Sequence, residues 1–381
     1  MTTPRYGEAS LPDVLPGVLA ALGVPDSPDP LGLAARLDGV RRVAVLLVDG
    51  LGWHLLPVAA PVAPTVADVV AGRLGTVLEL TAGFPSTTPT SLVGLGTGAL
   101  PGAHGVLGFF LKIPGTERIL DPRTWRDDPD PPTWQPVPSQ FARAVAAGVT
   151  VTVVSRPEFE GSGLTRAAYG DVPYRGAPDI GTLAAEIHAA LAAGPPTLVY
   201  GYHPTLDTMG HVFGVDSPRW REAAAEVDAL LTRLVDGLPG DAALLVTADH
   251  GQLNVPPEAR FDVGTDPRLD AGLTFVAGEP RVRYLYTRPG AVPDVVDAWR
   301  AVLGTAAAVL TRDEAVATGW YGPVPPRHLA RLGDVVVICR DRYAVLDGGR
   351  DLPGLARLVG FHGSATPDEM LVPLIVVRGN G

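Results

Sequence analysis

The sequence predicts an α/β fold built around a mostly parallel sheet with helices on both faces. Runs of β-branched and aliphatic residues, such as Val43–Val48 and Ala243–Thr247, are typical of strands that are buried on both faces. Segments of helical periodicity separate such runs, and strands that alternate with helices typically form parallel sheets. Both of these runs are followed by an aspartate and a nearby glycine, at the edge where open α/β sheets bind ligands.

Start and stop signals delimit the expected helices. Ser10 is a suitable N-cap and Gly23 a suitable end for the first helix. Asp179 can cap a later helix, and Ser217 followed by Pro218 places a cap before a proline in the first turn. The expected helices are 10–22, 66–71, 139–147, 180–193 and 218–235, and the expected core strands are 43–48, 76–80, 149–154, 197–202, 243–247 and 371–377.

The composition of the sequence changes at about residue 271. Strand-like segments at 281–286, 334–338 and 343–346 accompany helical segments at 292–303 and 311–318, before the chain returns to a core-like strand. We therefore expect a single α/β domain over residues 1–381, with a small inserted α+β cap at residues 271–346.

Composition and charge exclude several classes of partner. The chain has 381 residues, of which 46% are hydrophobic, and a formal net charge of −11. An acidic chain is a poor partner for nucleic acid or for an anionic membrane surface. We find no apolar run of membrane-spanning length, no signal-peptide pattern at the amino terminus, and a single cysteine, Cys339. We expect a cytoplasmic protein that binds neither nucleic acid nor membranes, and the sequence does not indicate its oligomeric state.

Acids and histidines occur where predicted strands end. Asp207 and His211 are four residues apart, so a helical turn would present both on one side. Three aspartates and three histidines at one sheet edge supply ligands for two metal ions, and the mixture of imidazole and carboxylate suits zinc, with manganese as an alternative. The candidate ligands are Asp49, Asp207, His211, Asp249, His250 and His362.

A cluster of hydroxyl groups, Ser86–Thr90, lies between a predicted strand and a segment of small residues that suits a tightly packed helix. The N-terminus of a helix favours an anion through its free N–H groups and its dipole. A threonine hydroxyl becomes a useful nucleophile only when a metal ion lowers its pKa. Spacing alone does not separate Thr87 from Thr88 in this role.

Two further stretches carry no predicted chemistry. His104 lies in the glycine-rich segment 100–111 and is expected to be structural rather than a ligand. The acidic, proline-rich stretch 121–132 is expected to be a solvated surface loop.

Five motifs in a fixed order suggest a known family. They are Val48-Asp49-Gly50, Phe84-Pro85-Ser86-Thr87-Thr88, the stretch Asp207 to His211, Thr247-Ala248-Asp249-His250-Gly251, and Phe361-His362-Gly363. In these motifs the chain resembles the alkaline phosphatase superfamily and, within it, the type I phosphodiesterase/nucleotide pyrophosphatase family. The resemblance covers about residues 40–270 and 355–378. It implies a three-layer sandwich of the alkaline phosphatase type.

The resemblance also implies a mechanism. Asp207, His211 and His362 would bind one zinc ion. Asp49, Asp249 and His250 would bind the other, together with the nucleophile, which the family's pattern places at Thr88. The expected activity is hydrolysis of a small phosphate ester as a phosphodiesterase or nucleotide pyrophosphatase.

Other functions remain open at this point. A phosphomonoesterase or phosphonate hydrolase would use the same machinery with another pocket. A non-catalytic binding protein could keep the fold, although all seven expected positions are intact. A phosphosugar mutase would need a larger insertion, and a sulfatase would need a cysteine or serine precursor followed by proline and arginine, which Thr88-Pro89-Thr90 lacks.

The chain departs from the family's pattern in one respect. Eukaryotic-type members carry Phe-Pro-Asn-His just after the nucleophile and an asparagine soon after the next His-Gly. Here the sequence reads Pro89-Thr90-Ser91 and, after His104-Gly105, Val-Leu-Gly-Phe. The asparagine that helps the family to bind a phosphoryl oxygen is absent, which leaves specificity for nucleotide diesters open. Backbone N–H groups after Thr88 could replace part of its role.

Overall fold

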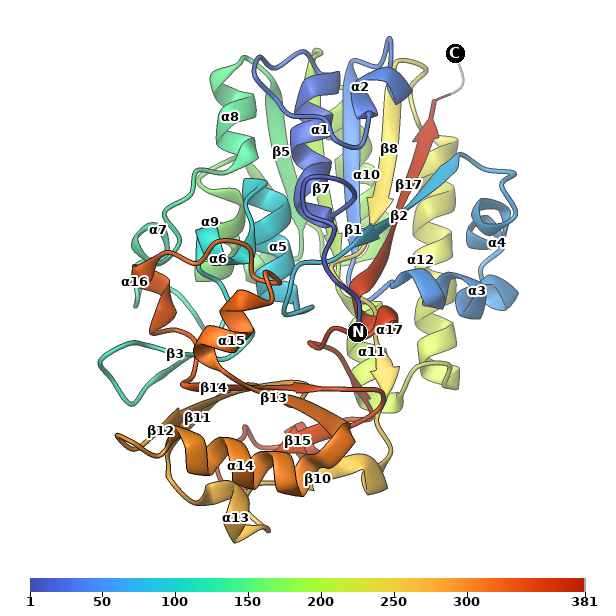
Figure 1. The fold of residues 1–381 in the computed structure, drawn as a ribbon. Helices are drawn as coiled ribbons and strands as arrows, with labels where there is room; N and C mark the ends of the chain where they lie inside the picture. The colour runs from blue at the N-terminus through green and yellow to red at the C-terminus, as the bar shows by residue number, and fades with distance from the viewer. Residues whose placement is uncertain (380–381) are drawn as a thin grey trace.

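A seven-stranded sheet forms the centre of the computed structural model, which describes residues 1–379 (Figure 1). Its strand order is β2-β17-β8-β1-β7-β5-β6. The last strand, β17, runs antiparallel to both of its neighbours, while the other adjacent pairs are parallel. The mostly parallel sheet predicted from the sequence is therefore confirmed. The strands are β1 (Arg42–Val48), β2 (Thr76–Thr81), β5 (Thr150–Ser155), β6 (Tyr174–Gly176), β7 (Thr197–His203), β8 (Ala242–Thr247) and β17 (Leu371–Arg378).

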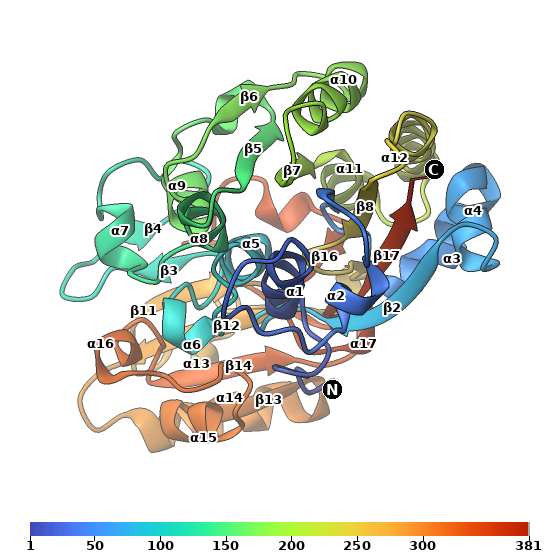
Figure 2. The ribbon, with the colours of Figure 1, turned by 90° about the horizontal axis from the view of Figure 1, so that it is seen from above.

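Helices cover both faces of this sheet, as Figure 2 shows from above. α10 (Ile180–Leu191) and α12 (Pro218–Asp236) lie on one face, and α1 (Val14–Ala21), α5 (Thr88–Thr97) and α8 (Gln140–Ala146) lie on the other. Two of the three expected caps form: the side chain of Asp179 accepts a hydrogen bond from Thr182 N–H, and that of Ser217 from Trp220 N–H, whereas the Ser10 hydroxyl donates to Asp13 instead. The remaining helices of this part are α2 (Leu33–Arg36), α3 (Leu56–Ala59), α4 (Pro64–Val70), α6 (Pro101–His104), α7 (Pro131–Trp134), α9 (Gly163–Tyr169), α11 (Thr205–Phe213) and α17 (Pro367–Met370).

A second sheet lies beyond the edge of the central sheet toward which β8 points (Figure 1). It has four antiparallel strands in the order β11-β12-β14-β13, namely β11 (Leu273–Glu279), β12 (Val282–Thr287), β13 (Ala307–Thr311) and β14 (Val335–Cys339). The sequence does not predict β11, because Ala277 and Gly278 have low strand propensity. We call residues 271–346 the cap; that they form an inserted subdomain of one domain stays a prediction. Its helices are α14 (Val292–Leu303), α15 (Arg312–Ala317) and α16 (Pro326–Leu329), with α13 (Pro267–Asp270) just before it.

Smaller strand pairs complete the structure. β10 (Arg260–Asp262) pairs with β15 (Ala344–Leu346), β9 (Leu253–Asn254) with β16 (Gly360–Phe361), and β3 (Leu111–Lys112) with β4 (Ile119–Leu120). Within residues 1–379, no helix has both the length and the apolar composition that a membrane span requires.

Candidate metal centre

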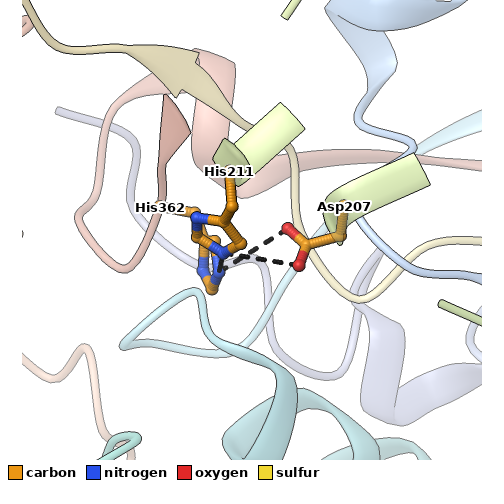
Figure 3. A group of neighbouring side chains, drawn as sticks. All are labelled: Asp207, His211 and His362. Carbon is orange, nitrogen blue, oxygen red and sulfur yellow. Dashed lines mark hydrogen bonds and ion pairs between the residues drawn. The ribbon is translucent and has the colours of Figure 1, made fainter. Parts of the chain in front are cut away.

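One group of three candidate ligands gathers around α11. Asp207 and His211 lie on one side of this helix, which follows β7, and His362 follows β16 (Figure 3). The Nε2 atom of His211 is 3.3 Å from Asp207 Oδ2 and 3.1 Å from His362 Nε2. The ligating atoms of the three residues lie within 4.8 Å of one another. The two residues that are four apart in the sequence thus supply two of the three side chains of this group.

A second group lies at the ends of two neighbouring strands. Asp49 follows β1, and Asp249 and His250 follow β8, which pairs with β1. His250 Nε2 is 3.5 Å from Asp49 Oδ1 and 3.3 Å from Asp249 Oδ2. Gly50 is required here: its φ is +75°, and a Cβ atom would lie 3.0 Å from Cβ of Asp207. The two triads are thus in close contact.

Backbone carbonyls orient all three histidines. The Nδ1–H groups of His211, His250 and His362 donate to the carbonyl oxygens of Gly360, Gly251 and Ser86, at 2.7, 3.0 and 3.0 Å respectively. In the neutral form of each ring, the Nε2 atom then carries the free lone pair and faces the triad. This outer hydrogen bond is the usual partner of a metal-binding histidine, because it fixes the tautomer and the ring orientation.

Hydrogen bonds from other side chains hold two of the carboxylates. Tyr202 donates its hydroxyl hydrogen to Asp49 Oδ2, and Gln252 Nε2 donates to Asp207 Oδ1 at 2.8 Å. Asp49 Oδ1 and Asp249 Oδ2 are buried and have no hydrogen-bond partner among the described residues. A buried carboxylate oxygen without a partner is costly unless a cation binds it. The donor set of both triads consequently fits a divalent metal ion.

Without a cation, groups of like charge within the site repel one another. Burial and the neighbouring carboxylates of Asp249 and Asp207 raise the pKa of Asp49 well above its ordinary value. Burial, together with His250 and His211, lowers the pKa of His362 well below its ordinary value. A deprotonated imidazole is the form that binds a metal.

Thr88 is the hydroxyl that reaches the second triad. Its Oγ1 atom lies 3.2 Å from His250 Nε2, and the residue is the first of α5. Thr87, the N-cap of the same helix, is completely buried, and its Oγ1 has no hydrogen-bond partner among the described residues. The tertiary structure thus separates two threonines that spacing left equivalent.

A cavity of about 250 Å³ opens beside Thr88 and Asp49. Phe109, from the glycine-rich segment 100–111, forms part of its wall, and so do Pro122 and Arg123. The stretch 121–132 is largely exposed, as expected, and its residues Pro122 and Arg123 reach the cavity. The other residues that line the cavity include Leu92, Glu158, Phe159, Leu164, Tyr169, Tyr174, Tyr202 and Asp207.

His104 lies outside the triads, as expected for a structural residue. Its ring is completely buried, and its Nδ1 accepts a hydrogen bond from Val106 N–H at 3.1 Å. Burial, followed by the charges of His328 and Arg331, lowers its pKa to about 3. The ring is therefore neutral and serves the packing of segment 100–110.

The arrangement of these elements has counterparts among solved structures. The murine ectonucleotide pyrophosphatase/phosphodiesterase 5, as an inactive variant in complex with AMP, matches with a TM-score of 0.71 and 19% identity over 89% of this chain and 88% of that chain. Phosphonoacetate hydrolase from Sinorhizobium meliloti 1021, in complex with phosphonoacetate, matches with a TM-score of 0.67 and 20% identity over 89% of this chain and 90% of that chain. This chain therefore shares its fold with these proteins, and the predicted α/β fold class is confirmed.

Sequence comparison then places the chain within a family. The family model for type I phosphodiesterase/nucleotide pyrophosphatase matches residues 43–365, and the chain belongs to this family. A relative from Saccharomyces cerevisiae, ectonucleotide pyrophosphatase/phosphodiesterase 2, is 27% identical over 200 residues, which are 45% of this chain. The match covers 38% of that relative's length.

Proposed function

We propose that this protein hydrolyses small phosphate diesters, with Thr88 as the nucleophile and two zinc ions bound by the two triads. The observation that carries the proposal is the contact of Thr88 Oγ1 with the triad of Asp49, Asp249 and His250, at 3.2 Å from the histidine nitrogen. This hydroxyl lies at the first residue of a helix and faces a cavity. The family match and the fold support the same chemistry.

Each residue then has a defined task. Asp207, His211 and His362 would hold one ion, and Asp49, Asp249 and His250 would hold the other with Thr88. Such a pair of ions lowers the pKa of a nucleophile and stabilises the leaving oxygen. The Thr88 oxygen forms a bond to phosphorus while the bond to the leaving alcohol breaks. The N-terminus of α5 favours the negative charge that Thr88 then carries, and water later releases the product.

The walls of the cavity favour a diester over a monoester. Leu92, Phe109, Phe159 and Tyr174 offer apolar and aromatic surface, which suits the second organic group of a diester. Arg123 is the one lysine or arginine among the lining residues of this cavity. Phosphomonoesterase activity is the alternative, and so is hydrolysis of a phosphonate, because a phosphonoacetate hydrolase shares the fold.

One set of assays tests these proposals. Protein purified without chelator is analysed for metals and then assayed with bis-p-nitrophenyl phosphate, p-nitrophenyl phosphate and phosphonoacetate. We expect about two zinc ions per chain and the highest kcat/KM for the diester. Preferred release of phosphate from the monoester or the phosphonate would replace the diesterase assignment. Full metal content without turnover of any substrate would favour a binding protein instead.

A further inference from the structure

Glu279 is a buried carboxyl group that the chemistry above does not use. It is the last residue of β11 in the cap, and its side chain is 6% exposed. Its Oε2 atom accepts a hydrogen bond from Phe109 N–H at 2.7 Å, whereas its Oε1 atom has no hydrogen-bond partner among residues 1–379. Burial raises the pKa of this carboxyl group to about 8, so its position is costly to the fold. A group of this kind calls for a functional explanation.

One side of Glu279 faces the wall of the substrate cavity. Phe109 lines the cavity, and hydrogen bonds from the cap hold the segment around this residue. Gly278 N–H donates to Phe110 O at 2.7 Å, and the Tyr284 hydroxyl donates to Leu107 O. Glu279 is the contact that fixes Phe109 itself.

The other side of Glu279 faces the loop of a candidate metal ligand. Gly363 follows His362 and has a φ of +127°. A Cβ atom at this glycine would lie 2.9 Å from Cγ and 3.0 Å from Oε1 of Glu279. The Gly363 carbonyl also accepts a hydrogen bond from Ser86 N–H at 3.0 Å, two residues before Thr88. The Glu279 side chain therefore stands between the Phe109 wall and the loop that carries His362.

We propose that Glu279 is a positioning residue that sets the width of the substrate cavity by holding Phe109 at a fixed place relative to the His362 loop. The proposal rests on the proposed function, because it concerns the binding of the organic group of the ester. In this proposal, the cap influences which substrates bind through the side chain of Glu279. An exclusively structural role would instead change the stability of the protein and leave substrate binding intact.

Kinetics of four variants test this role. Glu279→Ala should raise KM for bis-p-nitrophenyl phosphate about tenfold, the effect of losing one hydrogen bond, with kcat and zinc content retained. Glu279→Gln keeps an acceptor oxygen and should restore KM. Phe109→Ala should raise KM as well, and the double variant should be no worse than Phe109→Ala, because Glu279 acts through Phe109. Additive effects, or an unchanged KM in Glu279→Ala, would overturn the proposal.

A second measurement does not depend on activity. Amide hydrogen exchange of the Phe109 N–H should accelerate at least about tenfold in Glu279→Ala, because its acceptor is lost. The control is Glu258→Ala, which removes an exposed glutamate outside the cap and should leave this exchange unchanged. Unchanged exchange in Glu279→Ala would refute the positioning role even if the enzyme assay fails for another reason. Accelerated exchange in a protein without diesterase activity would refute only the proposed function.

Discussion

The imidazole rings of His250 and His362 stack face to face, with centroids 3.5 Å apart and an angle of 12° between the planes. The two rings belong to different triads, so the two candidate metal sites are in direct contact through these histidines. Two metal ions held by adjacent ligand groups can act together on one phosphoryl group. Because the rings are in contact, a substitution of one histidine also changes the surroundings of the other triad.

The metal content is the first prediction. Because His362 provides one nitrogen of the first triad, His362→Ala should lower the zinc content from about two ions per chain to about one. The retained ion should bind somewhat more weakly, since His250 loses its stacking partner. Elemental analysis after dialysis measures the content, and His54→Ala, which removes a partly exposed histidine outside both triads, is the control. Two ions in His362→Ala would remove this residue from the ligand set.

The nucleophile is the second prediction. Thr88→Ala should lower kcat by several orders of magnitude, whereas Thr88→Ser keeps the attacking oxygen and should retain a sizeable part of it. Thr87→Ala should cost far less, because Thr87 is buried and its Oγ1 atom has no hydrogen-bond partner among the described residues. Mass spectrometry of the acid-quenched reaction with bis-p-nitrophenyl phosphate should find a p-nitrophenyl phosphate group on Thr88, because only one of the two alcohols leaves when the Thr88 oxygen bonds to phosphorus. Loss of activity in Thr87→Ala alone would shift the assignment by one residue, and full activity in both would indicate a water nucleophile.

Stability at low pH is the third prediction. The pKa of His104 is about 3 in the folded protein, below the ordinary value of 6.5. The unfolded chain therefore binds this proton more tightly, so the contribution of His104 is complete above pH 6.5 and is lost as the pH falls toward 3. At pH 5 the loss amounts to about 2 kcal/mol.

Urea unfolding at pH 7.5 and pH 5 measures this effect. His104→Asn keeps an acceptor for Val106 N–H and should lose about 2 kcal/mol less than the natural protein between these pH values. His54→Asn serves as the control at a partly exposed histidine. An equal loss in the natural protein and in His104→Asn would show that other groups cause the acid sensitivity.

A buried ion pair between the cap and helix α17 gives the fourth prediction. Arg281 and Glu369 are fully buried and form two hydrogen bonds, of 2.9 and 2.7 Å. Glu369→Ala leaves the guanidinium buried without its partner and should lower the free energy of unfolding by about 3–5 kcal/mol.

The exposed pair of Arg219 and Glu222, at 2.8 Å, supplies the matched control. Glu222→Ala should cost less than about 1 kcal/mol. Arg281→Met combined with Glu369→Leu should recover much of the loss, because no charge then remains buried. A cost in Glu369→Ala as small as that in Glu222→Ala would show that water reaches the pair.

The sheet and all six candidate ligands could be predicted from the sequence. Runs that are apolar on both faces can only be central strands, and an aspartate after each of β1 and β8 must then lie at one edge, because the two strands are parallel neighbours. Asp207 and His211 were paired by the period of a helix. These features depend on local chemistry and on short-range geometry, which a sequence records directly.

How residues from distant segments meet at the site is visible only in the tertiary structure. His362 joins Asp207 and His211 across a separation of more than a hundred residues, with the cap between them. Phe109 and Arg123 reach the cavity from segments without a strand or helix pattern of their own, and Glu279 approaches Phe109 from a strand that the sequence does not predict. The choice of Thr88 over Thr87 likewise depends on which side of the helix N-terminus meets His250. Such contacts result from the packing of distant elements, and the pattern of neighbouring residues carries no record of it.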